Sequence, residues 1–207
     1  MTLYQYLLEQ FGTNEPIMTN EIFYKGYSKP WIYKELKKLC EQGKMIRYEK
    51  GVYYIPTETI LGPSVLNPRS VIEKKYIRNG LDDIIGYYSG YMFMNQLKLT
   101  AQMPNVIVIF TNNETSNIRN VQIGSQKVQL RKARTKITRS NAAILCFLEL
   151  MNSMSASFLD NEKKKIIDKY ILENGITRKD ITEYAPVFPD KAMRTLVESE
   201  VIYSVAH

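Results

Sequence analysis

Lysines and aromatic residues recur in a short segment near the N-terminus, and together they have the chemistry to bind a nucleic acid. Ammonium groups bind phosphates regardless of base sequence, whereas a side chain that enters the major groove can read base edges. Trp31 has a second interpretation, because an aromatic ring here could pack against a neighbouring hairpin. The predicted DNA contacts are Lys29, Trp31, Tyr33, Lys34, Lys37, Lys38, Arg47 and Lys50.

Positive charge is concentrated in the first two thirds of the chain. Residues 1–139 carry 20 Lys/Arg against 11 Asp/Glu, a net of +9, whereas residues 140–207 carry 8 against 10, a net of −2. Residues 115–148 contain seven basic residues and no acidic one. This distribution is typical of proteins that bind a polyanion, although an ordinary solvated basic surface is the alternative. The candidate backbone contacts in this segment are Lys127, Arg131, Lys132, Arg134 and Lys136.

Residues suited to catalysis are scarce. The only histidine is His207. Cys40 and Cys146 lie far apart among apolar residues, which favours free thiols in a reducing cytoplasm, with a disulfide as the alternative. Asp82 and Asp83 are adjacent and so point in different directions, which favours helix capping or solvent exposure over metal binding. We therefore predict no catalytic residue, no metal and no cofactor. A nuclease that uses scattered carboxylates is the enzymatic alternative.

The elements that would position the first group of residues follow the order of a winged helix-turn-helix. The predicted elements are helices over residues 2–11, 19–26 and 29–42 and strands over 45–49 and 52–56. Ser28 is a suitable N-cap for the longest helix, Gly43 ends it, and Lys50-Gly51 closes the hairpin. In this motif the longest helix enters the major groove and the hairpin meets the neighbouring backbone.

The rest of the chain predicts a mixed α/β domain and then further helices. The fold class is therefore α+β: an N-terminal winged helix-turn-helix, a mixed α/β domain and a helical C-terminal extension. Strands are predicted over residues 84–90 and 105–113 and in a hairpin over 120–134, and helices over 68–79, 89–99, 142–154, 160–175 and 189–201. Strand alternation in the hairpin would place Lys127, Gln129 and Arg131 on one face. The predicted domains are 1–58, 59–152 and 153–207. No apolar run is long enough to cross a membrane, and nothing looks like a signal peptide, so we expect a cytoplasmic protein.

Several short motifs follow one another in the middle of the chain. They are GYYSG at residues 86–90, NQLKL at 95–99, Thr100 with QMP at 102–104, and TNN at 111–113. In this order, and over roughly residues 3–150, the chain resembles the AbiEi-type antitoxin family of bacterial toxin–antitoxin operons. It departs from the family at Lys98, where we expect glycine in most members.

The resemblance implies a winged-helix repressor that binds inverted repeats in double-stranded DNA upstream of its own operon. It also implies a second domain that counteracts a cognate nucleotidyltransferase-like toxin without needing a stable complex. The basic residues between 127 and 136 would then form a DNA-backbone or antitoxin surface. The leading prediction is a non-enzymatic DNA-binding antitoxin whose oligomeric state is open. The alternatives are a winged-helix regulator without a toxin, a nucleic-acid-acting enzyme with a winged-helix targeting module, and a module that binds an acidic protein.

Overall fold

The computed structural model describes residues 1–80 and 83–205. The chain forms two compact units, Met1–Val71 (unit 1) and Ile72–His207 (unit 2). Helices and small sheets occur in the same chain, which confirms the mixed α+β class. The predicted domain boundaries after residues 58 and 152 stay predictions.

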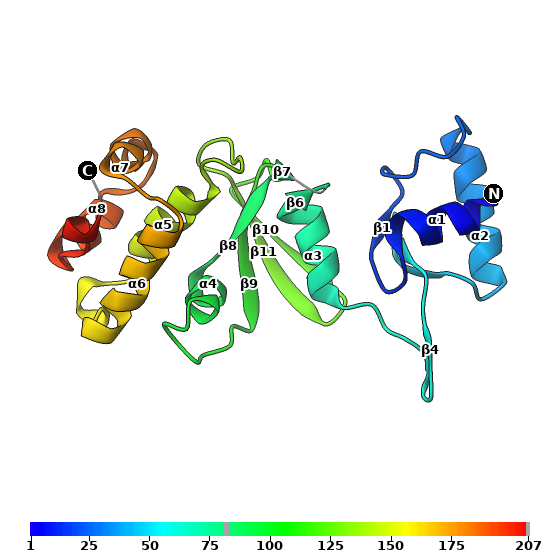
Figure 1. Cartoon of the computed structure of the whole chain (residues 1–207), viewed down its shortest axis with the longest axis horizontal. Helices are drawn as coiled ribbons and strands as arrows, with labels where there is room; N and C mark the ends of the chain where they lie inside the picture. Colours follow the sequence, from blue (N-terminus) through cyan, green and yellow to red (C-terminus); the bar gives the residue numbers. More distant parts are fainter. Residues whose placement is uncertain (81–82, 206–207) are drawn as a thin grey trace. The chain divides into compact units, whose positions relative to one another are not determined.

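Unit 1 is built around a small antiparallel sheet with the strand order β1-β3-β2. Its elements are α1 (Leu3–Phe11), β1 (Ile17–Met18), α2 (Lys29–Glu41), β2 (Ile46–Glu49) and β3 (Val52–Tyr54), shown in Figure 1. Thr2 and Gln5 form a reciprocal capping box that starts α1. Ile32 and Leu36 lie four residues apart on α2 and are buried with Leu7 of α1. The predicted helices over 2–11 and 29–42 and the hairpin closed by Lys50-Gly51 are therefore confirmed.

The predicted helix over residues 19–26 is wrong, because this segment forms turns and irregular backbone. Lys25 and Gly26 both have positive φ, +45° and +70°, and the amide of Tyr27 donates to the carbonyl of Tyr24. That geometry is a tight turn which a right-handed helix cannot contain. The ammonium group of Lys29 donates to the backbone carbonyls of Thr19 and Ile22, at 2.8 and 3.3 Å. The Lys29 side chain thus supplies the hydrogen bonds that these two carbonyls would have received from backbone amides in a helix.

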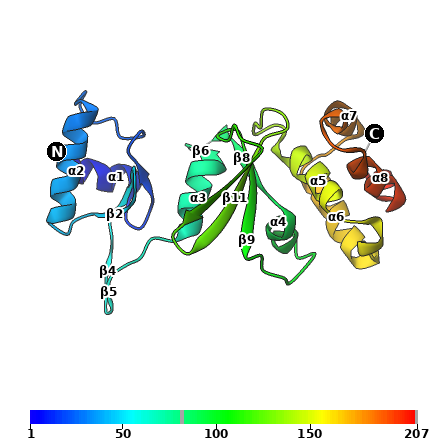
Figure 2. The same cartoon turned by 180° about the vertical axis from the view of Figure 1, so that it is seen from behind.

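A narrow hairpin follows β3. Its strands are β4 (Glu58–Thr59) and β5 (Gly62–Pro63), and it projects from the rest of unit 1 in Figures 1 and 2. Ile60 and Leu61 form its tip and are fully exposed, at 104% and 98%.

Unit 2 contains a mixed sheet with the strand order β10-β11-β9-β8. Its strands are β8 (Gly86–Ser89), β9 (Val106–Thr111), β10 (Ile118–Ile123) and β11 (Gln126–Lys132). β9 and β11 are parallel, and the other neighbours are antiparallel. The short strands β6 (Arg78–Asn79) and β7 (Asp83–Ile84) pair with each other before β8. The predicted strands and the Gly124-Ser125 hairpin are confirmed.

Helices cover both faces of this sheet (Figure 1). The helix α3 (Pro68–Tyr76) lies against one face, where the hydroxyl of Tyr88 contacts the Glu73 carboxylate at 3.4 Å. On the other side lie α4 (Gly90–Gln96) and α5 (Ala142–Ser153), as Figure 2 also shows. Phe147 and Leu148 of α5 are completely buried, because this helix contacts both the sheet and the helices that follow it.

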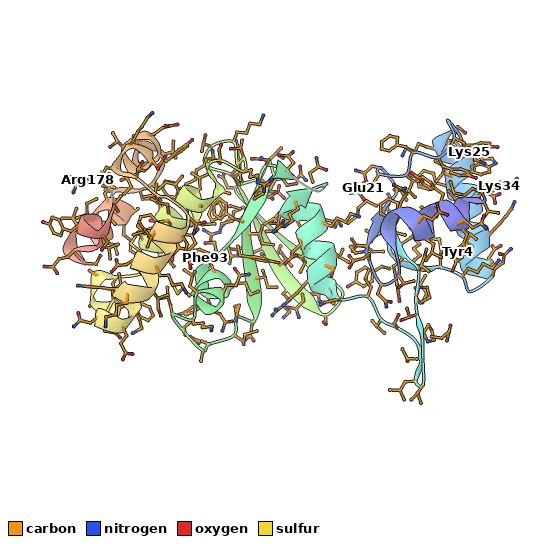
Figure 3. All side chains as sticks on the ribbon, in the orientation of Figure 1. Tyr4, Glu21, Lys25, Lys34, Phe93 and Arg178 are labelled. Atoms are coloured by element: carbon orange, nitrogen blue, oxygen red, sulfur yellow. The ribbon has the colours of Figure 1, made fainter. Side chains whose placement is uncertain are left out.

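The C-terminal part is helical, as predicted. It comprises α6 (Asn161–Glu173), α7 (Arg178–Tyr184) and α8 (Asp190–Glu198), with short 3-10 turns at Ala156–Phe158, Ala185–Val187 and Val201–Ser204. The ring of Phe93 on α4, labelled in Figure 3, meets Tyr170 of α6 edge to face at 5.6 Å. The hydroxyl of Tyr170 donates to the carbonyl of Ala143 at 3.1 Å. Within unit 2 these helices and the sheet therefore share α5 as a common core.

Candidate nucleic-acid interface

The exposed side of α2 carries the strongest candidate contacts. The helix begins after Ser28 with Pro30 in its first turn, where the missing amide of proline leaves no helical bond unmade. Because Ile32 and Leu36 face the core, Tyr33, Lys34 and Lys37 lie on the solvent side of the helix. Lys34 projects outward from α2 in Figure 3. This side combines positive charge with a half-exposed phenol ring.

The lysines of this region differ in how they are held. Lys38 pairs with Glu35 at 2.6 Å, and Lys37 lies 3.8 Å from Glu41. Such exposed pairs contribute only about 0.2–1 kcal/mol each to stability. A phosphate can therefore replace the carboxylate with little loss of stability. Among the described residues, Lys34 and Lys50 have no ion pair or hydrogen bond at their ammonium groups. These two are the cations most readily available to a phosphate.

Lys29 has a role inside unit 1. Its ammonium group holds the Thr19 and Ile22 carbonyls and lies 5.2 Å from the ring centre of Phe23. Its predicted contact with DNA would require breaking these bonds. We infer that Lys29 fixes the loop before α2, a role that sequence reasoning missed.

Trp31 packs against aromatic rings of that same loop. Its ring stacks on Tyr27 with centroids 4.0 Å apart and lies nearly parallel to Tyr24 at 6.1 Å. Trp31 is partly buried against the core of unit 1. The structure therefore favours packing for Trp31, although against the loop and not against the hairpin.

Two exposed aromatic residues next to α2 were not predicted as contacts. Phe23 is 76% exposed, and Tyr27 is about half exposed. Phe23 lies in the segment that was predicted as a short helix, and Tyr27 directly follows it, after the Lys25-Gly26 dipeptide that was an available turn signal. With Tyr33 they add apolar and stacking surface beside the lysines of α2.

The hairpin places Arg47 and Lys50 on the surface of unit 1. Lys50 lies in the turn between β2 and β3, and the Arg47 guanidinium donates to the carbonyl of Glu49 at 3.4 Å. The amide of Thr19 donates to the carbonyl of Gly51 at 3.0 Å, which ties the hairpin to the segment before α2. Helix and hairpin are thereby held together within one unit.

The five basic residues of the second group do not share one surface. Along β11, Lys127 and Arg131 lie on the same face as Gln129, as predicted from strand alternation, and Lys132 points to the opposite face. The Arg131 guanidinium is held by the Gln129 side chain at 2.9–3.0 Å. Lys136 is exposed beyond the end of the strand.

Arg134 belongs to a mostly buried ion pair. Its guanidinium donates to the Glu149 carboxylate at 2.9 Å and lies 5.5 and 5.0 Å from the ring centres of Phe110 and Phe188. Glu149 also accepts from the amide of Asn152 at 3.1 Å. The geometry gives Arg134 a structural role between the sheet, α5 and the C-terminal helices.

The TNN motif joins three segments of unit 2. The Thr111 hydroxyl donates to the carbonyl of Ile85, and the amide of Asn113 donates to the carbonyl of Lys75. Asn112 both donates to the carbonyl and accepts from the amide of Ile137, at 2.7 and 2.9 Å. These bonds use the polar groups of the motif for folding.

The GYYSG motif is also structural. A Cβ atom on Gly86 would lie 2.0 Å from the carbonyl oxygen of Tyr76 and 2.7 Å from that of Phe110, so no larger residue fits. Tyr87 is buried and stacks on Phe110 at 5.5 Å. The first glycine therefore permits α3 to approach the sheet closely.

Groups suited to catalysis do not gather among the described residues. No cluster of three or more His, Cys, Asp or Glu residues that could hold a metal ion occurs within residues 1–80 and 83–205. Asp82 and His207 lie outside the described residues. Both cysteines are free, and burial raises the pKa of the Cys40 and Cys146 thiols, which disfavours the reactive thiolate.

Comparison with known proteins gives a family but no activity. Residues 16–178 match the model of a family described as "Family of unknown function (DUF6088)". The chain belongs to this family. No curated protein matches the chain. Within residues 1–80 and 83–205, no helix has both the length and the apolar character needed to cross a membrane.

Proposed function

We propose that unit 1 is a winged helix that binds double-stranded DNA through α2 and the β2–β3 hairpin. The observation that carries this proposal is topological. The chain order is α1-β1-α2-β2-β3 and the strand order is β1-β3-β2. This strand order supports the proposal because a winged helix has the same one, with the last two strands as its wing. In place of a helix between β1 and α2, this chain has the loop that Lys29 holds.

The charges of unit 1 support the same role. Tyr33, Lys34 and Lys37 occupy the side of α2 that would face the major groove, and Lys50 lies at the tip of the wing. Lys34 and Lys50 would bind phosphates, since neither ammonium group has a partner among the described residues. Phe23 and Tyr27 would extend the contact beside the N-terminal end of α2.

On this proposal the chain is a non-enzymatic regulator that represses its own operon and counteracts a cognate nucleotidyltransferase-like toxin. The support for the antitoxin role is the motif resemblance in unit 2. Co-expression with the product of the adjacent gene tests it: rescue of growth from a toxic nucleotidyltransferase would support the role. If the neighbour encodes no toxin, or expression gives no rescue, unit 1 remains a regulator without a toxin partner.

The DNA-binding proposal is tested by titrating the protein with a duplex from upstream of its gene and with an unrelated duplex at several salt concentrations. Lys34→Ala and Lys37→Ala should each weaken binding to both duplexes. Each should also reduce the slope of log affinity against log salt by about 0.9, the effect of one lost phosphate contact. Lys165→Ala on α6 is the matched control, because Lys165 is an exposed lysine outside unit 1.

Binding to neither duplex at low salt would contradict the proposal. So would α2 variants that behave like the Lys165→Ala control. Unit 1 would then need another partner for its basic side.

A further inference from the structure

The strand β10 forms an open edge of the sheet in unit 2. It pairs with β11 on one side only, and no described strand lies along its other side. The register with β11 runs without interruption from Ile118–Arg131 to Ile123–Gln126. A regular strand of this length presents a row of unpaired backbone groups.

The hairpin geometry determines which backbone groups face outward. Gly124 and Ser125 form a two-residue turn, so Ile123 and Gln126 are a hydrogen-bonded pair. Since these pairs alternate along the ladder, the backbone groups of Ile118, Asn120 and Gln122 point away from β11. No backbone bond to these three residues occurs within the described part of the chain.

This edge lacks the features that usually protect one. Between Ile118 and Ile123 there is no proline, no lysine and no bulge. The single charge, Arg119, is paired with the buried Glu114 at 2.5 Å. Hydrogen bonds from the Ser116 amide and from Arg119 lower the pKa of the Glu114 carboxyl, so this pair stays charged and balanced at neutral pH.

We propose that β10 pairs antiparallel with β10 of a second copy of this chain, with Asn120 on the two-fold axis. Asn120 then faces Asn120 of the second copy, and Ile118 faces Gln122 on either side. The three facing pairs form about six backbone hydrogen bonds, two for each pair. The two sheets become one continuous sheet across the dimer.

The side chains of β10 suit this register. The Asn120 side-chain oxygen accepts from the Gln129 amide of β11 at 3.4 Å, and its own amide group and second lone pair can bond to Asn120 of the second copy. On the other face Arg119 lies opposite Val121, so no like charges lie directly opposite each other. Because antiparallel pairing about one central residue has two-fold symmetry, the same strand from a second copy can supply the other half of the interface.

The test measures the mass of the full-length chain by sedimentation equilibrium from low micromolar to submillimolar concentration, in the absence of DNA. The wild-type protein should show a reversible monomer–dimer equilibrium. Asn120→Lys and Asn120→Asp should each weaken association at least about fivefold, because each places like charges opposite one another at the axis. An equimolar mixture of the two variants should associate again, as a heterodimer with opposite charges at that position.

Ser125→Lys is the matched control, since it adds the same charge to the same hairpin at an exposed turn residue away from the edge. It should dimerise like the wild-type protein. Thermal unfolding of each variant checks that unit 2 is folded. Three outcomes overturn the proposal: a wild-type protein that is monomeric throughout, an Asn120→Lys variant that associates as tightly as the control, or a mixture that does not recover. None of them bears on DNA binding by unit 1.

Discussion

Replacing Arg134 should destabilise unit 2 strongly, whatever it does to any function. In Arg134→Met the apolar part of the side chain is kept and the guanidinium is lost. Among the described residues, the Glu149 carboxylate then keeps one hydrogen-bond partner, the side-chain amide of Asn152, although the Glu149 side chain is only 6% exposed. A buried carboxylate that has lost its paired cation strongly destabilises the folded state.

The expected loss can be worked from the structure. Removing one partner of a buried ion pair destabilises a protein by about 3–5 kcal/mol. The side chain of Arg134 is 24% exposed, so solvent already weakens the pair, and we take the lower end of that range. Losing its contacts with the rings of Phe110 and Phe188 adds about 0.5–1 kcal/mol each. The total, about 4 kcal/mol, is a large fraction of the 5–15 kcal/mol typical of a domain.

Urea denaturation followed by far-ultraviolet circular dichroism measures this loss. Glu149→Gln is the informative comparison, because its amide oxygen can still accept from Arg134 and the partly exposed guanidinium keeps access to water. Its loss should be about 1–2 kcal/mol, because the hydrogen bond is kept and only the extra strength that a charged acceptor gives it is lost. The reasoning is refuted if Arg134→Met loses less than Glu149→Gln, or if it unfolds at the wild-type urea midpoint. A functional assay of Arg134 variants without this control would mistake unfolding for a lost contact.

Two further substitutions test the motifs of unit 2. Lys98 has φ +62° after α4, a left-handed conformation that is strained for lysine and free of strain for glycine. Lys98→Gly should therefore stabilise by about 1 kcal/mol and raise the midpoint of thermal unfolding by roughly 3 °C. Lys98→Ala removes the charge but keeps the strain, and an equal gain in that variant would show that φ is not the cause. Gly86→Ala should prevent folding or destabilise by more than about 3 kcal/mol, because its Cβ would lie 2.0 Å from the Tyr76 carbonyl oxygen; a soluble variant with an unchanged unfolding midpoint would contradict this.

The periodic elements of the chain could be predicted from its sequence, and one irregular segment could not. Apolar spacing placed α2 and α5, and strand alternation placed Lys127 and Arg131 on one face of β11. The segment over residues 19–26 contains the same kinds of residue as a short helix. Its conformation depends on Lys29, whose ammonium group takes two of its carbonyls, and no local pattern shows where a long side chain will reach.

The candidate interface was predictable to a similar degree. Ser28, Ile32 and Leu36 fix which side of α2 faces solvent, so the exposure of Lys34 follows from spacing alone. The stacking of Trp31 on Tyr27 does not follow, because it needs the turn that brings this loop back to the helix. The ion pair of Arg134 could not be foreseen from spacing, since Glu149 lies in α5 and Phe188 just before α8, and only the tertiary fold brings them to Arg134.

The residues that carry the family resemblance are the residues that hold unit 2 together. Thr111, Asn112 and Asn113 join the end of β9 to three other segments, and Gly86 allows α3 to approach the sheet. A match in these motifs therefore argues for a shared scaffold, because any chain with this fold needs such bonds whatever it binds. Activity has to be sought in exposed residues that the scaffold does not require. Lys34 of α2 is such a residue, and the outward edge of β10 is such a surface, so experiments there separate function from folding.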